Sequence, residues 1–360
     1  MNSQIPNLCL IRENTSIRMA MSCIDRNAGK PVLITDDRGS FVDIVTDGDI
    51  RRILLKGLSL DEPITAILEN KLVTENQSPV TCLFNTSSED ILSLMRRHVV
   101  RYIPLLDEKG KVVELATLDD LSQSAPAMKA VVMAGGLGIR LRPLTSDLPK
   151  PMLLVGNKPI LETILDQLSS QGINEVFIST FYKSKKIIEY FGDGSAFGIQ
   201  INYLIEDRLT GTAGALRLLP EIDVPILVIN GDIITKMNFK SMLGFHQDNK
   251  ADLTVGLWQY QVKIEYGVVE TEGISIQGIT EKPSVDFLIN AGVYLLSPKC
   301  LCLVPDCILE GQTFHITDLL KSAIDQKYVV VGFPIHESWL DIGQPKDYEK
   351  AQAEYYVNEN

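Results

Sequence analysis

The sequence predicts two α/β domains in one chain of 360 residues. Two observations support this prediction: an internal repeat fills the first third of the chain, and residues 129–138 read as a buried strand that runs into a glycine-rich loop. The length exceeds that of one ordinary domain, and a hydrophobic fraction of 45% allows each part to bury a core. We therefore expect a module at residues 1–122, a short polar linker at 123–128 and a larger domain at 129–360.

The repeat defines the first domain. PVLITDDRGSFVDIVTDGDIRR (31–52) aligns with YIPLLDEKGKVVELATLDDLSQ (102–123) without a gap, at an offset of 71 residues. Each copy reads as an apolar strand, a turn, a second apolar strand and a T-x-x-D segment that opens a helix. An amphipathic helix is expected before each copy, in SIRMAMSCIDRNA and SEDILSLMRRHV. The first domain is thus predicted to be a duplicated β-α-β-β-α module.

The repeated T-x-x-D segment has two interpretations. Each Thr can simply cap the helix that follows it. Alternatively, the hydroxyl and the carboxylate can bind a ribose while the helix N-terminus attracts a phosphate. With both copies in place, residues 1–122 resemble a tandem pair of CBS domains, a regulatory module that commonly binds adenosine nucleotides. The resemblance implies that an adenine or guanine nucleotide is held by Thr46, Asp49, Thr117 and Asp120.

The most informative stretch of the second domain is VVMAGGLGIRLRPLTSDLPKPML (131–153). A strand followed by a glycine-rich turn indicates phosphate binding by backbone N–H groups. The stretch is neither a dinucleotide fingerprint nor a P-loop, because no third Gly and no G-K-[ST] follow. It carries two cations instead, Arg140 and Lys150. We expect these groups to hold a triphosphate.

The pattern GGxGxRLxPLT…PKPM resembles the sugar-1-phosphate nucleotidyltransferase family. Six further segments occur in the order typical of that family: EDRLTGTAGAL, VINGDII, YGVVE, ITEKP, INAGVYLL and WLDIGQPKDY. The resemblance covers residues 129–360 and implies a Rossmann-like domain with a mixed, mostly parallel sheet flanked by helices. Ile139 departs from the pattern, which often has Thr or Ser there.

Transfer of a nucleotidyl group depends on positioning and on charge neutralisation. Asp232 and Asp341 are isolated acids at predicted strand ends, and the resemblance assigns them to Mg²⁺, which prefers carboxylate and phosphate oxygens. Lys150 would neutralise the α-phosphate, and Arg140 would hold the departing pyrophosphate. The other residues that the resemblance implies in nucleotide binding are Ala134, Gly135, Gly136, Gly138, Glu206, Gly211 and Thr212. Those implied in sugar-phosphate binding are Gly267, Glu281, Lys282, Asn290 and Gly292.

Glu206 suggests the choice of base. In the family this position faces the base edge, and uridylyl- and thymidylyltransferases tend to place Gln there. An ionised carboxylate only accepts hydrogen bonds, which matches the two adjacent donors of guanine. GTP is therefore the favoured substrate, with a hexose or amino-hexose 1-phosphate. The alternatives are a uridylyl- or thymidylyltransferase acting on a glucose-type 1-phosphate, and a nucleotide-sugar sensor without catalysis. A Glu turned outward to solvent would remove the argument about the base.

The bulk properties exclude some partners. The formal net charge of −12 gives no basic field for nucleic acid, and no apolar run approaches the length of a membrane span. Six scattered cysteines without a signal peptide indicate reduced thiols in a cytoplasmic protein. A homo-oligomer is also expected.

Overall fold

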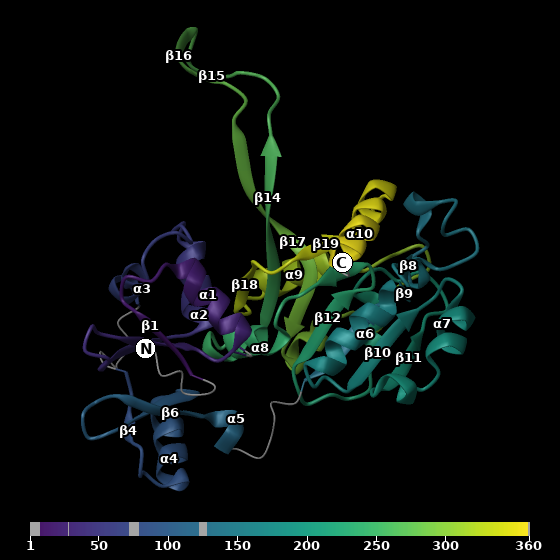
Figure 1. The fold of residues 1–360 in the computed structure, drawn as a ribbon. Helices are drawn as coiled ribbons and strands as arrows, with labels where there is room; N and C mark the ends of the chain where they lie inside the picture. Colours follow the sequence, from purple (N-terminus) through teal and green to yellow (C-terminus); the bar gives the residue numbers. More distant parts are fainter. Residues whose placement is uncertain (1–7, 28, 72–78, 122–127, 359–360) are drawn as a thin grey trace. The chain divides into compact units, whose positions relative to one another are not determined.

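The computed structural model describes residues 8–27, 29–71, 79–121 and 128–358. The chain divides into two compact units, Met1–Ala127 and Met128–Asn360 (Figure 1). The expected linker at 123–128 lies outside the described residues except for Met128.

The N-terminal unit contains two copies of one small fold, each with a three-stranded sheet. The elements of the first copy are β1 (Cys9–Arg12), α1 (Ile17–Arg26), β2 (Val32–Thr35), β3 (Phe41–Val45), α2 (Asp47–Leu55) and α3 (Thr65–Asn70). Those of the second copy are β4 (Cys82–Leu83), α4 (Ser88–His98), β5 (Tyr102–Leu106), β6 (Val112–Thr117) and α5 (Leu118–Leu121). In each sheet the middle strand pairs parallel with the first strand and antiparallel with the third.

The two copies share one register at the offset of 71 residues. Val32 pairs with Val45 in the first sheet, and Ile103 pairs with Ala116 at the equivalent place in the second. Both hairpins contain a bulge at the same position. The copies also contact each other, because the N–H of Phe41 donates to the carbonyl of Gly110 at 2.9 Å. The repeat in the sequence is therefore a repeat in the structure.

The C-terminal unit is built on a seven-stranded sheet in the order β11-β10-β7-β12-β17-β14-β18. These strands are β7 (Lys129–Met133), β10 (Glu175–Thr180), β11 (Gln200–Ile205), β12 (Ile226–Asn230), β14 (Leu253–Lys263), β17 (Ser284–Leu296) and β18 (Val330–Ile335). Only β17 runs antiparallel to its neighbours. The expectation of a mixed, mostly parallel sheet is confirmed.

Helices cover both faces of this sheet. The helices are α6 (Ile160–Ser170), α7 (Ser184–Phe191), α8 (Phe239–Asp248), α9 (Ile316–Asp325) and α10 (Pro345–Asn358). Side chains of β7 alternate between the two cores, because Ala130 and Val132 pack on the α6 and α8 side while Val131 packs on the α9 side. Among the described residues, no helix has the length and apolar character that crossing a membrane requires.

Three short strand pairs and several 3₁₀ turns complete the unit and position the site. The pairs are β8 (Leu154–Val155) with β9 (Lys158–Pro159), β13 (Ile233–Thr235) with β19 (Trp339–Asp341), and β15 (Val268–Glu272) with β16 (Ser275–Thr280). The long strands β14 and β17 leave the sheet together and carry β15 and β16 at the end of a projecting hairpin (Figure 1).

Candidate functional site

The two predicted metal acids lie side by side, although more than 100 residues separate them in the sequence. Asp232 follows β12 and directly precedes β13. Strand β13 pairs antiparallel with β19, and this places Ile233 opposite Asp341. The N–H of Ile342 also donates to the carbonyl of Asp232 at 3.0 Å. One short strand pair therefore creates the acidic pair.

Lys150 adds a cation to this pair. The residue opens a 3₁₀ turn (Lys150–Met152), and its ammonium group forms an ion pair with Oδ2 of Asp232. Both side chains are largely buried, at 13% and 25% exposed. The other carboxylate oxygen of Asp232, Oδ1, is buried and has no hydrogen-bond partner among the described residues. A buried oxygen without a partner is unfavourable, so Asp232 is prepared to receive a cation or a donor from a ligand.

Asp341 has an unusual affinity for protons. Burial and, to a smaller extent, the neighbouring charge of Asp232 raise the pKa of this carboxyl group to about 6, while the charge of Lys150 acts in the opposite direction. The side chain nevertheless keeps an exposed surface. An acid in this position is stabilised in its charged form by any added cation.

The glycine-rich loop borders the charged cluster. Gly138 adopts a left-handed conformation, with φ of 62°, and its carbonyl accepts a hydrogen bond from the Thr145 hydroxyl at 2.7 Å. A Cβ at Gly138 would lie 3.3 Å from Cβ of Lys150, so the loop packs directly on that lysine. Within the described chain, the N–H groups of Gly135, Gly136 and Gly138 donate no hydrogen bond. Unoccupied N–H groups beside a cation form a cradle for phosphate.

Arg140 lies on the exposed 3₁₀ turn that follows the loop (Ile139–Leu141). Its charge lowers the pKa of Asp341, although burial dominates and the net shift is upward. Arg140 is therefore within electrostatic reach of the acidic pair. The structure places Arg140, Lys150, Asp232 and Asp341, four of the residues that the resemblance implies, in one region of the C-terminal unit.

The side chain of Glu206 is turned inward, so the alternative of a Glu turned outward to solvent does not hold. The residue is 8% exposed. The Ser179 hydroxyl donates to its Oε1 at 2.8 Å, and the hydroxyl of Thr210 donates to its Oε2. A Cβ at Gly135 would lie 2.9 Å from the same Oε1, so the carboxylate lies directly against the glycine-rich loop. Oε2 also accepts a hydrogen bond from the Thr210 N–H at 3.3 Å, so Oε1 has the greater remaining capacity to accept a ligand donor.

The segment after Glu206 packs against the loop before α9. Gly211 has φ of 92°, and a Cβ there would come within 2.5 Å of the Phe314 carbonyl oxygen. The Thr212 hydroxyl accepts a hydrogen bond from the N–H of Ile316 at 3.0 Å. Glycine is thus required at position 211 by the close approach of two backbones. The Thr212 hydroxyl holds the first residue of α9.

Two of the predicted sugar-site residues lie beside the acids. Gly292 has φ of 72°, and a Cβ there would lie 2.7 Å from Nδ2 of Asn230. Its N–H donates to Oδ1 of Asn290 at 3.1 Å. Burial raises the pKa of Tyr294 to about 12, and the charge of Asp232 adds to this rise. Strand β17 therefore presents Asn290 and Gly292 next to the end of β12.

The other three sugar-site residues are not brought to this cluster. Gly267, Glu281 and Lys282 flank β15 and β16, and all three are exposed. Figure 1 places these strands at the far end of the projecting hairpin, away from β12 and β19. Gly267 and Glu281 do contact each other, because a Cβ at Gly267 would lie 2.9 Å from Oε2 of Glu281.

In the N-terminal unit both T-x-x-D segments form helix caps. The Thr46 hydroxyl accepts the N–H of Asp49 at 3.1 Å, and Asp49 also binds Arg52 at 2.7 Å. The Thr117 hydroxyl accepts the N–H of Asp120 at 3.0 Å. The Asp120 carboxylate is 62% exposed and lies 3.5 Å from the ammonium group of Lys30. The capping interpretation is thus satisfied in both copies, and a nucleotide would have to share these groups.

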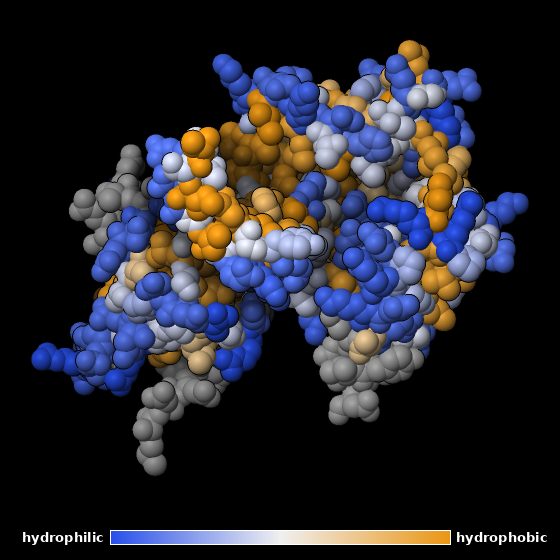
Figure 2. Space-filling model, turned by 90° about the horizontal axis from the view of Figure 1, so that it is seen from above, coloured by the Kyte–Doolittle hydropathy of each residue, from blue (hydrophilic) through white to orange (hydrophobic). Residues whose placement is uncertain are grey.

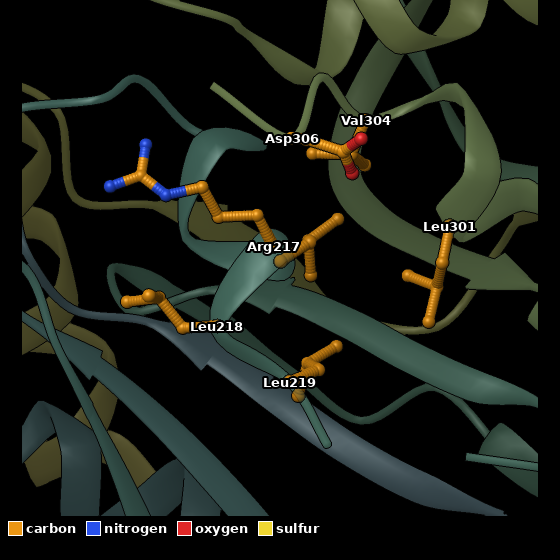
Figure 3. A pocket seen from close by; sticks show the side chains of 7 residues that line it. Arg217, Leu218, Leu219, Leu301, Val304 and Asp306 are labelled. Atoms are coloured by element: carbon orange, nitrogen blue, oxygen red, sulfur yellow. The ribbon is translucent and has the colours of Figure 1, made fainter. Parts of the chain in front are cut away.

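A separate hollow of about 350 Å³ lies between two 3₁₀ turns of the C-terminal unit, Gly214–Leu218 and Pro298–Leu303. Five aliphatic residues line it, with Arg217 running along one side and its guanidinium directed away from Leu219 and Leu301 (Figure 3). None of the predicted site residues lines this hollow.

Sequence reasoning missed several residues that shape the site. Ser179 and Thr210 hold Glu206, Thr145 holds the glycine loop, and Asn230 lies against Gly292. The signal for Asn230 was its place beside Asp232 in the segment VINGD. Thr145 and Thr210 lie inside the segments GGxGxRLxPLT and EDRLTGTAGAL, whereas Ser179 stands outside the recognised patterns, and only the fold brings it to Glu206.

Parts of both units of the chain match known protein families. Residues 129–357 match the family described as Nucleotidyl transferase, and residues 73–125 match the CBS domain. A D-glycero-alpha-D-manno-heptose 1-phosphate guanylyltransferase from Aneurinibacillus thermoaerophilus is 37% identical over 231 residues, which cover 63% of this chain and 98% of that protein. A mannose-1-phosphate guanyltransferase from Yarrowia lipolytica is 34% identical over 233 residues, which cover 61% of this chain. The match spans only 62% of the Yarrowia protein's length.

A solved structure supports the same fold. The crystal structure of a putative glucose-1-phosphate thymidylyltransferase from Bacillus anthracis superposes with a TM-score of 0.52 at 25% identity, covering 63% of this chain and 94% of that one. The matched family segment fills more than half of the chain and contains the whole charged cluster. The chain belongs to the nucleotidyl transferase family, and it carries a CBS domain in its N-terminal unit.

Proposed function

We propose that the C-terminal unit condenses a nucleoside triphosphate, preferably GTP, with a sugar 1-phosphate to give a nucleoside diphosphate sugar and pyrophosphate. A phosphate oxygen of the sugar substrate attacks the α-phosphorus, and the bond between that phosphorus and the β-phosphate oxygen breaks. The observation that carries the proposal is the cluster of Lys150, Asp232 and Asp341 beside a loop with unoccupied N–H groups.

The residues present fit Mg²⁺. Asp232 offers a buried oxygen without a partner among the described residues, and Asp341 offers a second carboxylate on the paired strand. Hard carboxylate oxygens are the ligands that this ion prefers. When bound, Mg²⁺ would supply a Lewis acid that neutralises the phosphate charge. Lys150 would exchange part of its contact with Asp232 for the α-phosphate, and Arg140 would hold the leaving pyrophosphate.

Glu206 supports the preference for GTP. Its buried carboxylate is held by two hydroxyl donors and lies against Gly135 of the phosphate loop. An acceptor in this place favours a base that presents N–H donors, and guanine presents two. The relatives at 37% and 34% identity are named guanylyltransferases of heptose and mannose 1-phosphates. These names favour a mannose-type sugar among the hexose and amino-hexose candidates.

The direct experiment is a pyrophosphate-release assay on the purified full chain. GTP, UTP and dTTP are each combined with mannose, glucose, glucosamine and manno-heptose 1-phosphates in the presence of Mg²⁺. We expect GTP with a mannose-type substrate to give the highest kcat/KM. If no pair exceeds the background of Asp232→Asn, the chain is not a transferase of this class. A nucleotide-sugar sensor without catalysis is then the remaining alternative.

For the N-terminal unit we propose regulation by an adenine or guanine nucleotide that uses Thr46, Asp49, Thr117 and Asp120. Calorimetric titration of AMP, ATP and GMP into the full chain tests this, with Asp49→Ala and Asp120→Ala as the deficient variants. Asp90→Ala is the matched control, because Asp90 takes part in a helix cap with Ser87 but lies outside the T-x-x-D segments. Binding that survives both deficient variants would contradict the assignment.

A further inference from the structure

Residues 142–149 carry the glycine-rich loop back to its second 3₁₀ turn, and we call them the return segment. Within this segment only Thr145 and Pro149 are buried, while Leu144 and Leu148 are 45% and 36% exposed. Seen from above, exposed apolar residues lie among hydrophilic ones over the C-terminal unit (Figure 2). A segment with little apolar packing depends on polar contacts to keep one conformation. The polar contacts of the return segment therefore decide where it lies.

Two neighbouring side chains shortly after β10 hold the return segment from outside. The Tyr182 hydroxyl lies 3.4 Å from the carbonyl oxygen of Thr145 and 3.3 Å from that of Ser146, to which it donates. The ammonium group of Lys183 donates to the same Ser146 carbonyl and lies 3.8 Å from the Asp147 carboxylate. This ammonium group also lies 5.2 Å from the centre of the Tyr182 ring, so the two side chains interact with each other. We call Tyr182 and Lys183 the latch.

Lys183 is a poor choice for its own local structure. Its backbone is left-handed, with φ of 52°, a conformation that residues other than Gly, Asn and Asp rarely adopt. It is also the N-cap residue of α7, where a positive charge is unfavourable and where its side chain makes no capping hydrogen bond. Gly, Asn or Asp would suit both conditions better. A residue that fits its local backbone badly is expected to contribute elsewhere, and the contact that the structure shows is the one with Ser146.

The segment that carries the latch also contacts other parts of the nucleotide site. The Ser179 hydroxyl donates to the carboxylate that we expect to read the base. Phe181 packs on the glycine-rich loop, because a Cβ at Gly135 would lie 3.6 Å from Cβ of Phe181. The return segment in turn holds Gly138, whose carbonyl accepts the Thr145 hydroxyl. The end of β10 and the residues after it therefore support the base-reading residue, the glycine-rich loop and the return segment together.

We propose that Tyr182 and Lys183 are positioning residues, which hold the glycine-rich loop in the conformation that binds the triphosphate. Neither side chain needs to touch the nucleotide, because each acts through a backbone carbonyl of the return segment. When the latch is broken, the loop spends less time in the binding conformation, and the apparent affinity for the nucleotide falls by that fraction. This inference rests on the proposed function, because it assumes that the loop binds a nucleoside triphosphate.

The kinetic test separates a positioning role from a structural one. Lys183→Gly removes the ammonium group and relieves the left-handed strain, so the variant should unfold at the same temperature as the unmodified chain or at a higher one. Its KM for GTP should nevertheless rise about tenfold, because a charge-assisted hydrogen bond is lost. Tyr182→Phe keeps the ring and should raise this KM about threefold. Both kcat and the KM for the sugar 1-phosphate should stay within about twofold of the unmodified values.

Lys250→Gly and Lys327→Gly are the matched controls. Both lysines are also left-handed, with φ of 48° and 63°, and both lie outside the glycine-rich loop and the segment after β10. These variants gain the same relief of strain and should leave the KM for GTP unchanged. A merely structural role of Lys183 would instead give a lower unfolding temperature and affect the KM values of both substrates alike, and this result would overturn the proposal.

Hydrogen exchange of the full chain without substrates tests the latch without any turnover. The amides of residues 139–148 should exchange about threefold to tenfold faster in both latch variants than in the unmodified chain, and at the unmodified rate in both controls. Unchanged exchange of these amides in the latch variants would overturn the proposal. Faster exchange with an unchanged KM for GTP would also overturn it.

Failure of the proposed function gives a different result. If the unmodified chain turns over no nucleotide, that function is wrong, whereas the exchange rates still show whether the latch holds the loop. The affinity for GTP, measured by calorimetry, then replaces KM in the comparison of the latch variants with the controls. Weaker GTP binding in the latch variants alone would support the positioning role, and absence of GTP binding in the unmodified chain would overturn it.

Discussion

Acidification is expected to destabilise the C-terminal unit through one buried histidine. His246 on α8 is 3% exposed. Its Nδ1 lies 2.8 Å from the Thr254 hydroxyl, and its Nε2 lies 3.0 Å from the Ser297 hydroxyl, which also donates to a backbone carbonyl. The neutral ring therefore donates from Nε2 and accepts at Nδ1. A second proton on Nδ1 would break the hydrogen bond from Thr254.

The size of the effect follows from the pKa. Burial lowers the pKa of His246 to about 4, although the charge of Asp252 opposes this shift. In the unfolded chain the pKa is about 6.5, so between these values the unfolded state binds more protons and stability rises with pH. The stabilisation from a neutral His246 is fully present above pH 6.5 and is lost as the pH falls towards 4. At pH 5 the loss is about 2 kcal/mol, out of a limit of about 3 kcal/mol.

Tryptophan emission during guanidinium unfolding measures this effect in the right unit, because both tryptophans of the chain, Trp258 and Trp339, lie in the C-terminal unit. The comparison is between the unmodified protein and His246→Gln at pH 7, 6 and 5. Other carboxyl groups titrate in both proteins and cancel in the difference. We expect the variant to lose about 2 kcal/mol less between pH 7 and pH 5. Parallel curves for the two proteins would refute the reasoning.

Three further predictions concern the site. Asp232→Asn and Asp341→Asn should each lower kcat at least about 100-fold while unfolding stays cooperative, and near-normal Mg²⁺-dependent turnover would remove the metal assignment. Glu206→Gln should reduce the ratio of kcat/KM for GTP to that for UTP, because an amide can also donate; a higher kcat/KM for UTP in the unmodified protein would contradict the base argument. Gly211→Ala should destabilise the C-terminal unit by about 2 kcal/mol or more in denaturant titrations, whereas Gly244→Ala in open space on α8 should stabilise it by about 0.5–1 kcal/mol.

The sequence predicted the repeat and its offset of 71 residues, because turn residues and apolar spacing are local signals. Gly39 and Gly110 have positive φ angles of 80° and 74°, which the two equivalent turns require and which glycine adopts without strain. The closeness of Asp232 and Asp341 could be inferred only by resemblance. It depends on the pairing of β13 with β19, and no local pattern reports a contact across more than 100 residues.

The environment of Glu206 shows a second limit of sequence reasoning. The residue type indicated a hydrogen-bond acceptor. Its burial, however, depends on Ser179 near the end of β10 and on Thr210, which lies four residues after Glu206. Likewise, the alternation from Trp258 to Lys263 predicts a strand with two faces, but not that this strand leaves the sheet. Local periodicity identifies the faces of an element, and only tertiary packing decides which face is covered.

The exposed hairpin tip makes the C-terminal unit divisible. A break between Gly273 and Ile274 would leave Asp232 on one fragment and Asp341 on the other. The fragments would share the long pairings of β17 with β12 and β14, so the central sheet could reassemble without a covalent link. Such a pair would behave as a split enzyme, whose activity reports the reunion of its two halves when each is fused to one of two interacting proteins.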